Sequence, residues 1–446
     1  MSGSQFLDRL SDLVKKARNL GADAADALMV EGTSVSVSRR LGKPESLTRS
    51  EGRDLGLRVL VGHRQAIVSS SDVSPSALAD LPARALAMAR AVPEDPFCGL
   101  ADPAWLATDI PDLDLIDAAE PSVETLTEWA DKAEAAAMAV KGVTNSEGAS
   151  AGAGRASIGL VTSTGFARAF DSSDASVSIS VLAGEGTGME RDYDHTSAVH
   201  ASDLLAPEII GRAAGEKAVK RLAPRKVGSG KVAIVFDPRV SRSLVSHLAG
   251  AVNGSSVARG TSFLKDKMGE RILANGIVVI DDPKRRRGLN SRPFDGEGVA
   301  TTRRAIVEAG VLKSWILDCR SARQLNLKTT GHAARGVSSP PGPSTSNLHL
   351  EPGTMSPEAM IGRLASGFYV TELIGFGVNG VTGDYSRGAT GFWIDKGEIA
   401  YPVSEVTIAG NLKDMFLNMT VASDLEFRYA TNAPTVLVEG MTVAGA

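Results

Sequence analysis

The segment GVNGVTGDYSRGATGFWIDKGEIAYPVSEVTIAGNLKDMF, residues 377–416, decides the fold of the last third of the chain. It holds seven glycines, and aromatic residues lie on either side of them. Two short apolar runs, 391–394 and 403–408, are separated by Lys396 and Gly397, which is typical of a turn between antiparallel strands. The segment therefore predicts a strand-rich C-terminal part with tight, glycine-containing turns.

The sequence before this segment extends the same part of the chain back to about residue 226. KVAIVF at 231–236 predicts a strand, and residues 239–253 predict a helix that follows Asp237 and Pro238. Short apolar segments predict further strands at 277–280, 303–308 and 311–317. We therefore assign residues 226–446 to one strand-rich C-terminal domain.

The N-terminal part combines helices with alternating segments. Residues 4–20, 74–92, 122–140 and 207–222 predict helices, and 4–20 carries its apolar side chains on one face. Alternating segments predict strands at 34–39, 55–61, 155–161, 165–170, 176–183 and 189–199. Helices packed on an antiparallel sheet form two layers. We therefore expect an α+β protein, with one or more N-terminal two-layer α/β lobes on an antiparallel sheet before the strand-rich domain.

A proline-rich stretch separates two N-terminal units. Residues 93–121 contain five prolines and few periodic apolar residues, which indicates a connector. We expect an N-terminal α+β domain at 1–95 and a middle α+β domain at 96–225, with residues 93–121 as the linker. The C-terminal domain, 226–446, would carry the helix at 239–253.

Composition favours a cytoplasmic globular protein. The chain has 446 residues and a net charge of −4, so it has no general attraction to nucleic acid or to anionic membranes. Its two cysteines, Cys98 and Cys319, are far apart in sequence, which excludes a disulfide framework and fits a reducing compartment. No secretory signal is visible, and no apolar run approaches the roughly 20 residues that cross a bilayer.

Several long segments, in order along the chain, resemble one protein family. Besides residues 377–416, they are TNSEGASAGAGRASIGLVTSTGF (144–166), GMERDYDH (188–195), RPFDGEGVATTRRAIVEAGVLKSWILD (292–318) and ASDLEFRYATNAPTVLVEGMTVAG (422–445). Together they resemble the TldD/PmbA family, specifically its PmbA (TldE) branch, whose members are also named modulators of DNA gyrase. The resemblance implies a cytoplasmic two-component zinc peptidase that acts in peptide proteolysis and maturation.

The resemblance also shows where zinc would bind in this family. Zinc-bearing members carry an H-E-x-x-x-H helix and a late cysteine, which hold the ion and supply a general base. The matching helix here reads HLAGAV at 247–252: His247 is present, Leu248 replaces the glutamate and Val252 replaces the second histidine. No cysteine follows Cys319, and LEFR at 425–428 stands where it should fall. We therefore expect no catalytic or metal-binding residue in this chain, and zinc in a partner subunit.

The implied partners are a zinc-bearing TldD-like subunit, in a heterodimer, and an unfolded peptide substrate. A homodimer is expected when the chain is isolated. The glycine-flanked segment at 382–387 combines an acid, a base and a phenol without apolar periodicity, so it is our candidate cleft loop for peptide or partner. Its residues are Thr382, Gly383, Asp384, Tyr385, Ser386 and Arg387. A turn in which Asp384 bonds to nearby backbone is the alternative.

Other motifs favour structural interpretations. GASAG at 148–152 matches a nucleophile elbow, but residues 141–147 do not suggest the strand that the motif needs before it. GFGVNG at 375–380 matches a dinucleotide fingerprint but does not open a helix. The basic run at 284–287 follows two acids, which indicates a solvated loop, and His195 and His200 suggest polar surface.

Two alternative functions stay open from the sequence. The chain could be an active metalloprotease that uses different zinc ligands, because it resembles a peptidase family along its length. It could also be a non-enzymatic modulator of DNA gyrase, as the names used in the family imply.

Overall fold

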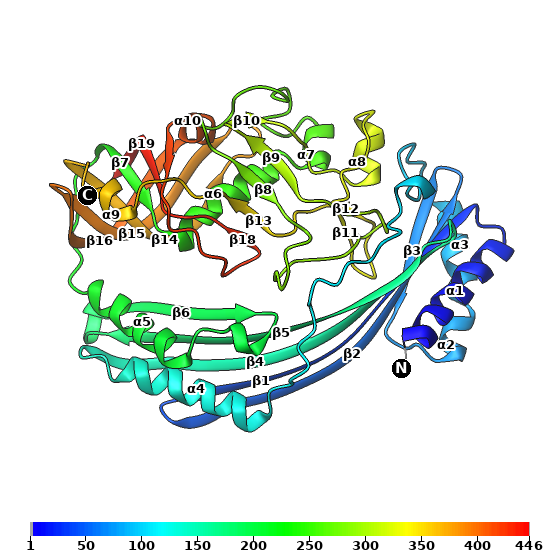
Figure 1. The fold of residues 1–446 in the computed structure, drawn as a ribbon, viewed down its shortest axis with the longest axis horizontal. Coiled ribbons are helices and arrows are strands. Elements are labelled where there is room, and N and C mark those ends of the chain that lie inside the picture. The colour runs from blue at the N-terminus through cyan, green and yellow to red at the C-terminus, as the bar shows by residue number, and fades with distance from the viewer. Residues whose placement is uncertain (1–2, 446) are drawn as a thin grey trace.

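The protein has two lobes, which lie one above the other in Figure 1. A computed structural model describes residues 3–445. The N-terminal lobe is a long curved antiparallel sheet with helices packed on it, and the C-terminal lobe consists mainly of strands. The predicted α+β class is therefore confirmed.

Six strands form the N-terminal sheet, in the order β3-β2-β1-β4-β5-β6. Four of them have 17 to 20 residues, whereas the sequence predicted shorter pieces. The predictions failed in the Ser, Gly and Ala runs of β4 and β5 and in the charged first half of β2, where few residues are strongly apolar. The strands are β1 (Ala24–Arg40), β2 (Lys43–Val61), β3 (Arg64–Ser70), β4 (Val143–Thr162), β5 (Ala167–Ala183) and β6 (Glu190–Ala198).

Helices cover one face of this sheet in two groups. One end carries α1 (Gly3–Asn19), α2 (Pro75–Ala79) and α3 (Leu81–Ala91), and the other carries α4 (Val123–Met138) and α5 (Pro207–Lys220). Odd-numbered residues of β1, such as Met29 and Val37, point into these two cores. Even-numbered Leu28 lies on the opposite face, in a cluster with Phe294 of the C-terminal lobe. The alternation therefore places helices on one face and the second lobe on the other.

The parts predicted as domains 1–95 and 96–225 share this sheet. Each has its own helix-covered core, but β1 pairs with β4 from Asp26 opposite Thr162 to Arg39 opposite Ala149. The connector at 93–121 contains only the short 3-10 helix η1 (Pro103–Trp105) and bonds to the C-terminal lobe, where Ala107 donates to the Gly298 carbonyl. The domain boundaries stay a prediction.

A closed barrel forms much of the C-terminal lobe. Its sheet has the order β16-β15-β14-β7-β19-β17, and an additional pairing of β16 with β19 closes it. The predicted turn at Lys396 and Gly397 is confirmed, with φ of 50° and 83°, as a tight hairpin requires. The strands are β7 (Gly230–Phe236), β14 (Ser366–Val378), β15 (Asp384–Asp395), β16 (Glu398–Asn411), β17 (Met419–Val421) and β19 (Val436–Ala444).

A second, smaller sheet and several short helices complete this lobe. The sheet has the order β10-β9-β8-β13-β18, with β8 (Val279–Asp281), β9 (Arg304–Glu308), β10 (Val311–Leu312), β13 (Leu348–Leu350) and β18 (Thr431–Asn432). The predicted strand at 311–317 is therefore only two residues long. The remaining elements are α6 (Pro238–Ala251), α7 (Gly254–Ala258), α8 (Cys319–Gln324), α9 (Pro357–Ile361), α10 (Leu412–Leu417), β11 (Ala333–Ala334), β12 (Gly342–Pro343) and the 3-10 turns η2 (Gly186–Gly188) and η3 (Ala201–Asp203).

Helix α6 belongs to the main core of this lobe, which contains residues of the barrel and of the second sheet. Among residues 3–445, no helix is long and apolar enough to cross a membrane.

Candidate functional site: the His247 helix and the cleft between the lobes

Helix α6 is the element that carries the predicted zinc-helix positions. Asp237 caps its start by accepting a hydrogen bond from the Arg239 amide at 3.0 Å, and Pro238 occupies the first turn. Leu248 is 2% exposed and Val252 is fully buried, and both belong to the main core of the lobe. The two positions where zinc-bearing relatives need polar groups thus contribute to hydrophobic packing.

His247 lies beside these residues, half-buried on the same helix. Its ring lies 6.0 Å from the Tyr385 ring, edge to face. Its Nε2 is buried and makes no hydrogen bond to any residue that the structure describes. Burial and the nearby Arg387 cation both lower the pKa of His247, so the ring is neutral at pH 7.

The predicted cleft loop is only partly a loop. Thr382 and Gly383 form a turn, but Asp384 to Arg387 are the first residues of β15, paired with β14 on one side and β16 on the other. The strand was not recognised in the sequence because Tyr385 is the one buried side chain among polar neighbours here, so the usual alternation of apolar and polar residues is weak. Asp384 accepts hydrogen bonds from Thr382 Oγ1 at 2.6 Å and Asn411 Nδ2 at 3.1 Å, so it ties the turn to the end of β16.

The structure brings the helix that carries His247 close to the 382–387 segment, which the sequence did not indicate. His247 and Arg387 line one cavity of about 330 Å³, whose walls include Phe263, Phe376 and Leu412. The Arg387 guanidinium makes no ion pair within the described residues, and its Nε donates to the Ile374 carbonyl at 3.3 Å. Ser386 is exposed on β15. This cavity is the first half of the candidate site.

These residues do not match a zinc coordination set. Structural and catalytic zinc sites use three or four protein ligands of the His, Cys, Asp or Glu types. Residues 3–445 contain no cluster of three such side chains with a suitable arrangement. On α6, His247 offers one nitrogen and its charged neighbour is a cation, which repels a metal ion. Leu248 and Val252 offer no donor atom.

The second half of the candidate site is a cleft between the lobes. Strand β6 faces the start of α6 across this cleft. The Arg239 guanidinium of α6 donates hydrogen bonds of 2.6 and 3.1 Å to the two carboxylate oxygens of Asp192. The Asp194 carboxylate forms ion pairs with the Lys217 ammonium at 3.0 Å and with the Arg428 guanidinium at 2.9 Å. Burial alone would raise the pKa of Asp192, but the hydrogen bond and charge of Arg239 outweigh it and lower the pKa. The polar-surface prediction for His195 holds only in part, because His195 is half-buried and its neighbours Asp192 and Asp194 are buried.

Aromatic side chains line the same cleft. A cavity of about 230 Å³ lies between Tyr193 and His195 of β6 and Tyr429 of the other lobe. His195 lies 5.1 Å from the Tyr429 ring, and Arg242 of α6 covers that ring at 4.2 Å. Burial first, and then Arg428, lower the pKa of His195. Glu426 and Arg428, from the segment where the resemblance led us to expect a cysteine, also line this cavity.

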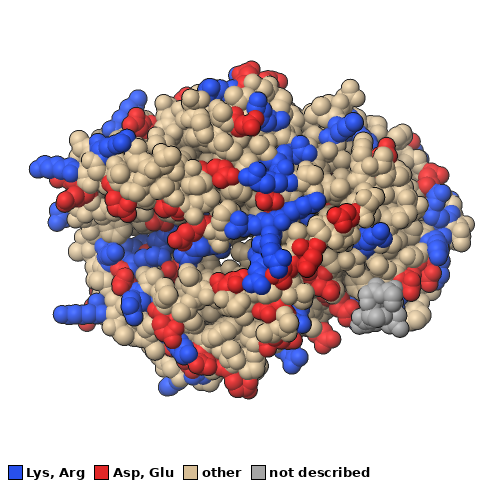
Figure 2. All heavy atoms as spheres, in the orientation of Figure 1, with Lys and Arg blue, Asp and Glu red and all other residues tan. Residues whose placement is uncertain are grey.

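The basic run at 284–287 borders a second cavity of about 300 Å³. Arg287 bonds to Asp114 at 2.6 Å and to Asp203 at 3.1 Å, and Arg285 lies 3.4 Å from the centre of the Phe427 ring. Figure 2 shows basic side chains gathered along the boundary between the lobes, around an opening, with acidic ones beside them. The predicted solvated loop is therefore a contact between the lobes.

The sheet face toward this cleft is lined by small hydroxyl side chains. Ser38 lies opposite Ser150, which lies opposite Ser178, and Ser178 lies opposite His195. The next row runs through Ser36, Gly152, Ser176 and Ser197. Valines between these serines point to the helices on the other face. We call this surface the serine face. The alternation in SVSVS and SVSIS was the signal that could have revealed it.

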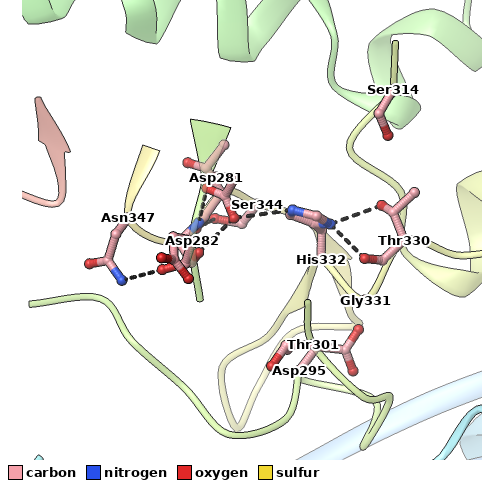
Figure 3. Close-up of polar contacts among 12 residues, drawn as sticks. Asp281, Asp282, Asp295, Thr301, Ser314, Thr330, Gly331, His332, Ser344 and Asn347 are labelled. Atoms are coloured by element: carbon pink, nitrogen blue, oxygen red, sulfur yellow. Dashed lines mark hydrogen bonds and ion pairs between the residues drawn. The ribbon is translucent and has the colours of Figure 1, made fainter. Parts of the chain in front are cut away.

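A buried Asp-His pair nearby is structural. His332 Nε2 lies 3.1 Å from Asp281 Oδ2, and the other oxygen of Asp281 accepts from the Ser346 amide at 2.8 Å (Figure 3). His332 Nδ1 lies 2.9 Å from both the carbonyl and the hydroxyl of Thr330. Both partners are buried, and both ring nitrogens already have partners. This arrangement fixes the loops of the C-terminal lobe and leaves no ring nitrogen for a substrate.

The two short motifs also have structural positions. GASAG at 148–152 lies inside β4, which begins at Val143, so the expectation of no strand at 141–147 was wrong. The chain continues as a strand and not as a helix, so no nucleophile elbow forms. GFGVNG at 375–380 covers the end of β14 and the turn toward β15, and it opens no helix. His200, the other histidine of the polar-surface prediction, is buried and its Nε2 lies 3.0 Å from the Asp114 carbonyl.

Comparison with known proteins gives consistent matches along the chain. Residues 25–89, 116–222 and 229–445 match the first, central and C-terminal domains of the PmbA/TldA metallopeptidases. A protein of Escherichia coli O157:H7 named metalloprotease PmbA is 41% identical over 441 residues, covering 98% of this chain and 96% of the relative.

Solved structures with the same fold include a Bacteroides thetaiotaomicron protein described as a candidate modulator of DNA gyrase. It is 27% identical, with a TM-score of 0.90 and 98% of each chain covered. TldE from Thermococcus kodakarensis has a TM-score of 0.88, covers 98% of this chain and 100% of its own, and is 21% identical, which shows the shared fold.

Proposed function

Because the chain belongs to the PmbA/TldD metallopeptidase family, we propose that it is the PmbA/TldE-type, non-catalytic subunit of a cytoplasmic two-component zinc peptidase. It pairs with a zinc-bearing relative, and the pair cleaves unfolded peptides. The ion and the general base belong to the partner subunit.

The observation that carries this proposal is the packing of helix α6. Leu248 and Val252 occupy the positions of a general base and a zinc ligand, and both are buried in the main core. A carboxylate or an imidazole at either position would have to leave water without a hydrogen-bond partner in a well-packed interior. In this proposal the chain keeps the fold of the family, and the two helix positions contribute apolar packing in place of metal binding.

The surfaces around the cleft support a role in holding peptide. The serine face offers hydroxyl groups on a curved sheet, and small side chains let an extended backbone approach closely. The aromatic residues Tyr193 and Tyr429 and the cations beside them line the cleft above it. Such a surface binds chains of varied sequence, because backbone groups and aromatic rings are recognised without a fixed side-chain pattern.

Metal analysis tests the zinc part of the proposal. The chain, purified alone in metal-free buffer and then supplied with zinc, should hold far less than one ion per chain after dialysis. His247→Ala should not change that value. Zinc bound at one per chain, and lost in His247→Ala, would show that the chain has its own metal site.

Pairing is tested separately, with the zinc-bearing relative from the same organism as a defined partner. Size-exclusion chromatography of the mixture should give a complex that contains both chains. Two chains that elute separately at micromolar concentration would contradict the subunit role, whatever the zinc content of either chain.

A further inference from the structure

One cavity at the boundary between the lobes contains a cation without an anionic partner. Arg287 forms ion pairs with Asp114 at 2.6 Å and with Asp203 at 3.1 Å, and Arg286 shares Asp114 at 2.9 Å. Arg285 lines the same cavity of about 300 Å³ and forms no ion pair within residues 3–445. We call this space the Arg285 cavity. It holds one positive charge that the described chain does not pair.

Packing holds the Arg285 guanidinium in place. Its central carbon lies 3.4 Å from the centre of the Phe427 ring, and His349 contacts the same ring edge to face at 5.0 Å. A guanidinium that stacks through its flat face keeps its N–H groups, which lie in its plane, available for an acceptor. Burial lowers the pKa of Arg285, and the nearby Asp282 carboxylate offsets only part of this effect. A bound anion would therefore stabilise the charge.

A carboxylate is the anion that best fits the Arg285 cavity. Paired N–H donors of a guanidinium match the two oxygens of a carboxylate, and one negative charge balances one cation. Asp203 also lines the cavity and would repel the second charge of a phosphate dianion. Phe427 and Tyr429 add aromatic walls, which suit the apolar part of an organic ligand.

The Arg285 cavity shares two walls with the cavity of about 230 Å³ beside Tyr193, which we call the Tyr193 cavity. Tyr429 lines both of them. Strand β6 contributes Tyr193 and His195 to the Tyr193 cavity and Ser197 and Ala198 to the Arg285 cavity. From Tyr193 to Ser197 the strand spans about 13 Å, at roughly 3.3 Å per residue. A short extended peptide is therefore long enough to reach both cavities.

The Tyr193 cavity offers a carboxylate no comparable partner. Its cations Lys217 and Arg428 are already paired with Asp194, at 3.0 and 2.9 Å. Glu426 also lines it and forms no ion pair within the part of the chain that the structure describes. A negative charge on a ligand that spans both cavities is therefore better placed at the Arg285 end.

The backbone of β6 is already engaged where it borders the Tyr193 cavity. The Tyr193 amide donates to Asp192 at 2.8 Å, and the His195 amide donates to Asp194 at 2.8 Å. Arg428 donates to the His195 carbonyl. Pairing of a ligand strand with these groups would break these bonds, although β6 is the last strand of its sheet. Side chains must therefore supply the main contacts to a ligand here.

We propose that the Arg285 cavity binds a carboxylate of the bound peptide, and that the peptide extends from there along β6 to the Tyr193 cavity. The carboxylate has two sources, the C-terminus of the peptide or an Asp or Glu side chain. This inference rests on the proposed role of the chain in holding peptide, and it adds a charge requirement at one end of the cleft.

The first test compares three short peptides by fluorescence anisotropy with the full chain. All three carry an N-terminal label and the same uncharged sequence. One ends in a free carboxylate, one in an amide, and one in an amide preceded by a single glutamate. The wild-type chain should bind the free acid about tenfold more tightly than the plain amide. Recovery of tight binding by the glutamate peptide shows that a side chain is accepted, and no recovery assigns the cavity to the C-terminus.

Arg285→Gln should remove this preference, because the variant loses the charge and the paired donors. Its dissociation constants for acid and amide should agree within about twofold. Lys284→Gln is the matched control and should keep the preference, since Lys284 is exposed on the same loop, outside the lining of the cavity, and forms no ion pair within residues 3–445. Equal binding of acid and amide by the wild type, a preference that survives Arg285→Gln, or an equal loss in Lys284→Gln would overturn the proposal.

This binding assay separates the carboxylate site from the subunit role. A chain that forms the complex with the zinc-bearing relative but binds acid and amide equally would contradict the carboxylate site and leave the subunit role intact. A chain that prefers the acid but elutes separately from the relative would contradict the subunit role and leave the carboxylate site intact.

The second test locates the peptide by photo-crosslinking. A benzophenone side chain next to the free C-terminus should attach to residues 197–198 or 427–429. A benzophenone about four residues earlier should attach to residues 193–195, because an extended chain covers that distance. Digestion and mass spectrometry identify the sites of attachment. The reverse order, or the same sites for both peptides, would overturn the proposed path along β6.

Discussion

Single residues on helix α6 carry the proposal that this chain binds no zinc. Leu248 and Val252 are buried where zinc-bearing relatives carry polar side chains, while His247 is retained with a neutral ring against Tyr385. Within residues 3–445, His247 belongs to no group of three metal-ligating side chains, and its charged neighbour Arg387 disfavours a cation. We therefore expect that no single substitution on α6 gives this chain a zinc site.

Restoring the glutamate alone should cost stability and yield no activity. Leu248→Glu places a carboxyl group among apolar side chains, and the free energy of unfolding should fall by about 3 kcal/mol. Leu248→Met keeps the volume and apolar character and should lose less than about 1.5 kcal/mol. Urea denaturation measures both variants. Peptide cleavage by Leu248→Glu alone would show that the zinc-helix alignment is wrong.

A second residue-scale prediction concerns a buried acid beneath the lobe boundary. Burial, reinforced by the charge of Asp295, raises the pKa of Glu297 to about 7. The folded state therefore holds a proton on this group that the unfolded state releases near pH 4.5. The free energy of unfolding should fall as pH rises from about 4.5 to 7, by up to about 3 kcal/mol from this group.

Glu297→Gln should remove this pH dependence, because an amide side chain does not titrate. Its oxygen can still accept the hydrogen bond that the Cys319 amide donates to Glu297 at 2.8 Å, so the local structure should be kept. The melting temperature of the variant relative to wild type should be higher at pH 8 than at pH 5. The same difference at both values would show that Glu297 does not titrate in this range.

At the scale of elements, nearby residues at the start of β15 have two different roles: one stabilises a hairpin and the other lines a cavity. Asp384 connects the turn between β14 and β15 to Asn411 of β16, whereas Arg387 lines the cavity beside α6 and makes no ion pair with any residue that the structure describes. The first contact stabilises the hairpin. The second leaves a cation free for a peptide or for the partner subunit.

Two single variants should separate these roles. Asp384→Ala should lower the melting temperature and leave peptide cleavage by the two-chain complex unchanged. Arg387→Ala should leave the melting temperature unchanged and lower cleavage, without loss of pairing. Arg168→Ala, on the N-terminal lobe, serves as the surface control. If Arg387→Ala cleaves as wild type does, the cavity has no part in peptide binding.

The elements also show how far the sequence alone could lead. Local patterns predicted the helix at 122–140, the turn at Lys396 and Gly397, and the helix that contains His247. Caps, turns and periodicity are properties of neighbouring residues, so a local pattern can reveal them. The long strands β4 and β5 were predicted as fragments, since their Ser, Gly and Ala runs carry little apolar signal. The contacts of His247 with Tyr385 and of Asp194 with Arg428 depend on closing the barrel and docking the lobes, which local patterns do not encode.

At the scale of the whole molecule, charge pairs hold the two lobes together across the cleft. Asp26 of β1 is buried between Arg58 of β2 and Arg335 of the C-terminal lobe. Asp192 with Arg239 and Asp194 with Arg428 join the lobes at the other end. Because both lobes line the cleft, these pairs oppose any separation of the lobes.

Acid should therefore weaken the cleft before it unfolds either core. The pKa values of Asp192 and Asp194 are lowered in the folded state, so their contribution is present above about pH 4 and is lost as pH falls further. Small-angle scattering should show a radius of gyration that grows as the pH is lowered from 4 toward 2, compared with its value at pH 7. Asp192→Asn should lose about 3 kcal/mol at pH 7, because Arg239 is left without its carboxylate, and should show a smaller change with pH. A radius of gyration that is independent of pH in both proteins would contradict this role.

The central proposal is that this chain contributes a fold and a cleft, while a partner subunit performs the chemistry. Cleavage of an unfolded peptide, measured for the chain alone, for the zinc-bearing relative alone and for the mixture, tests it most directly. We expect no cleavage by this chain alone with added zinc, cleavage that requires the mixture, and an unchanged rate when His247→Ala replaces the wild type. Zinc-dependent cleavage by this chain alone, abolished in His247→Ala, would contradict the account.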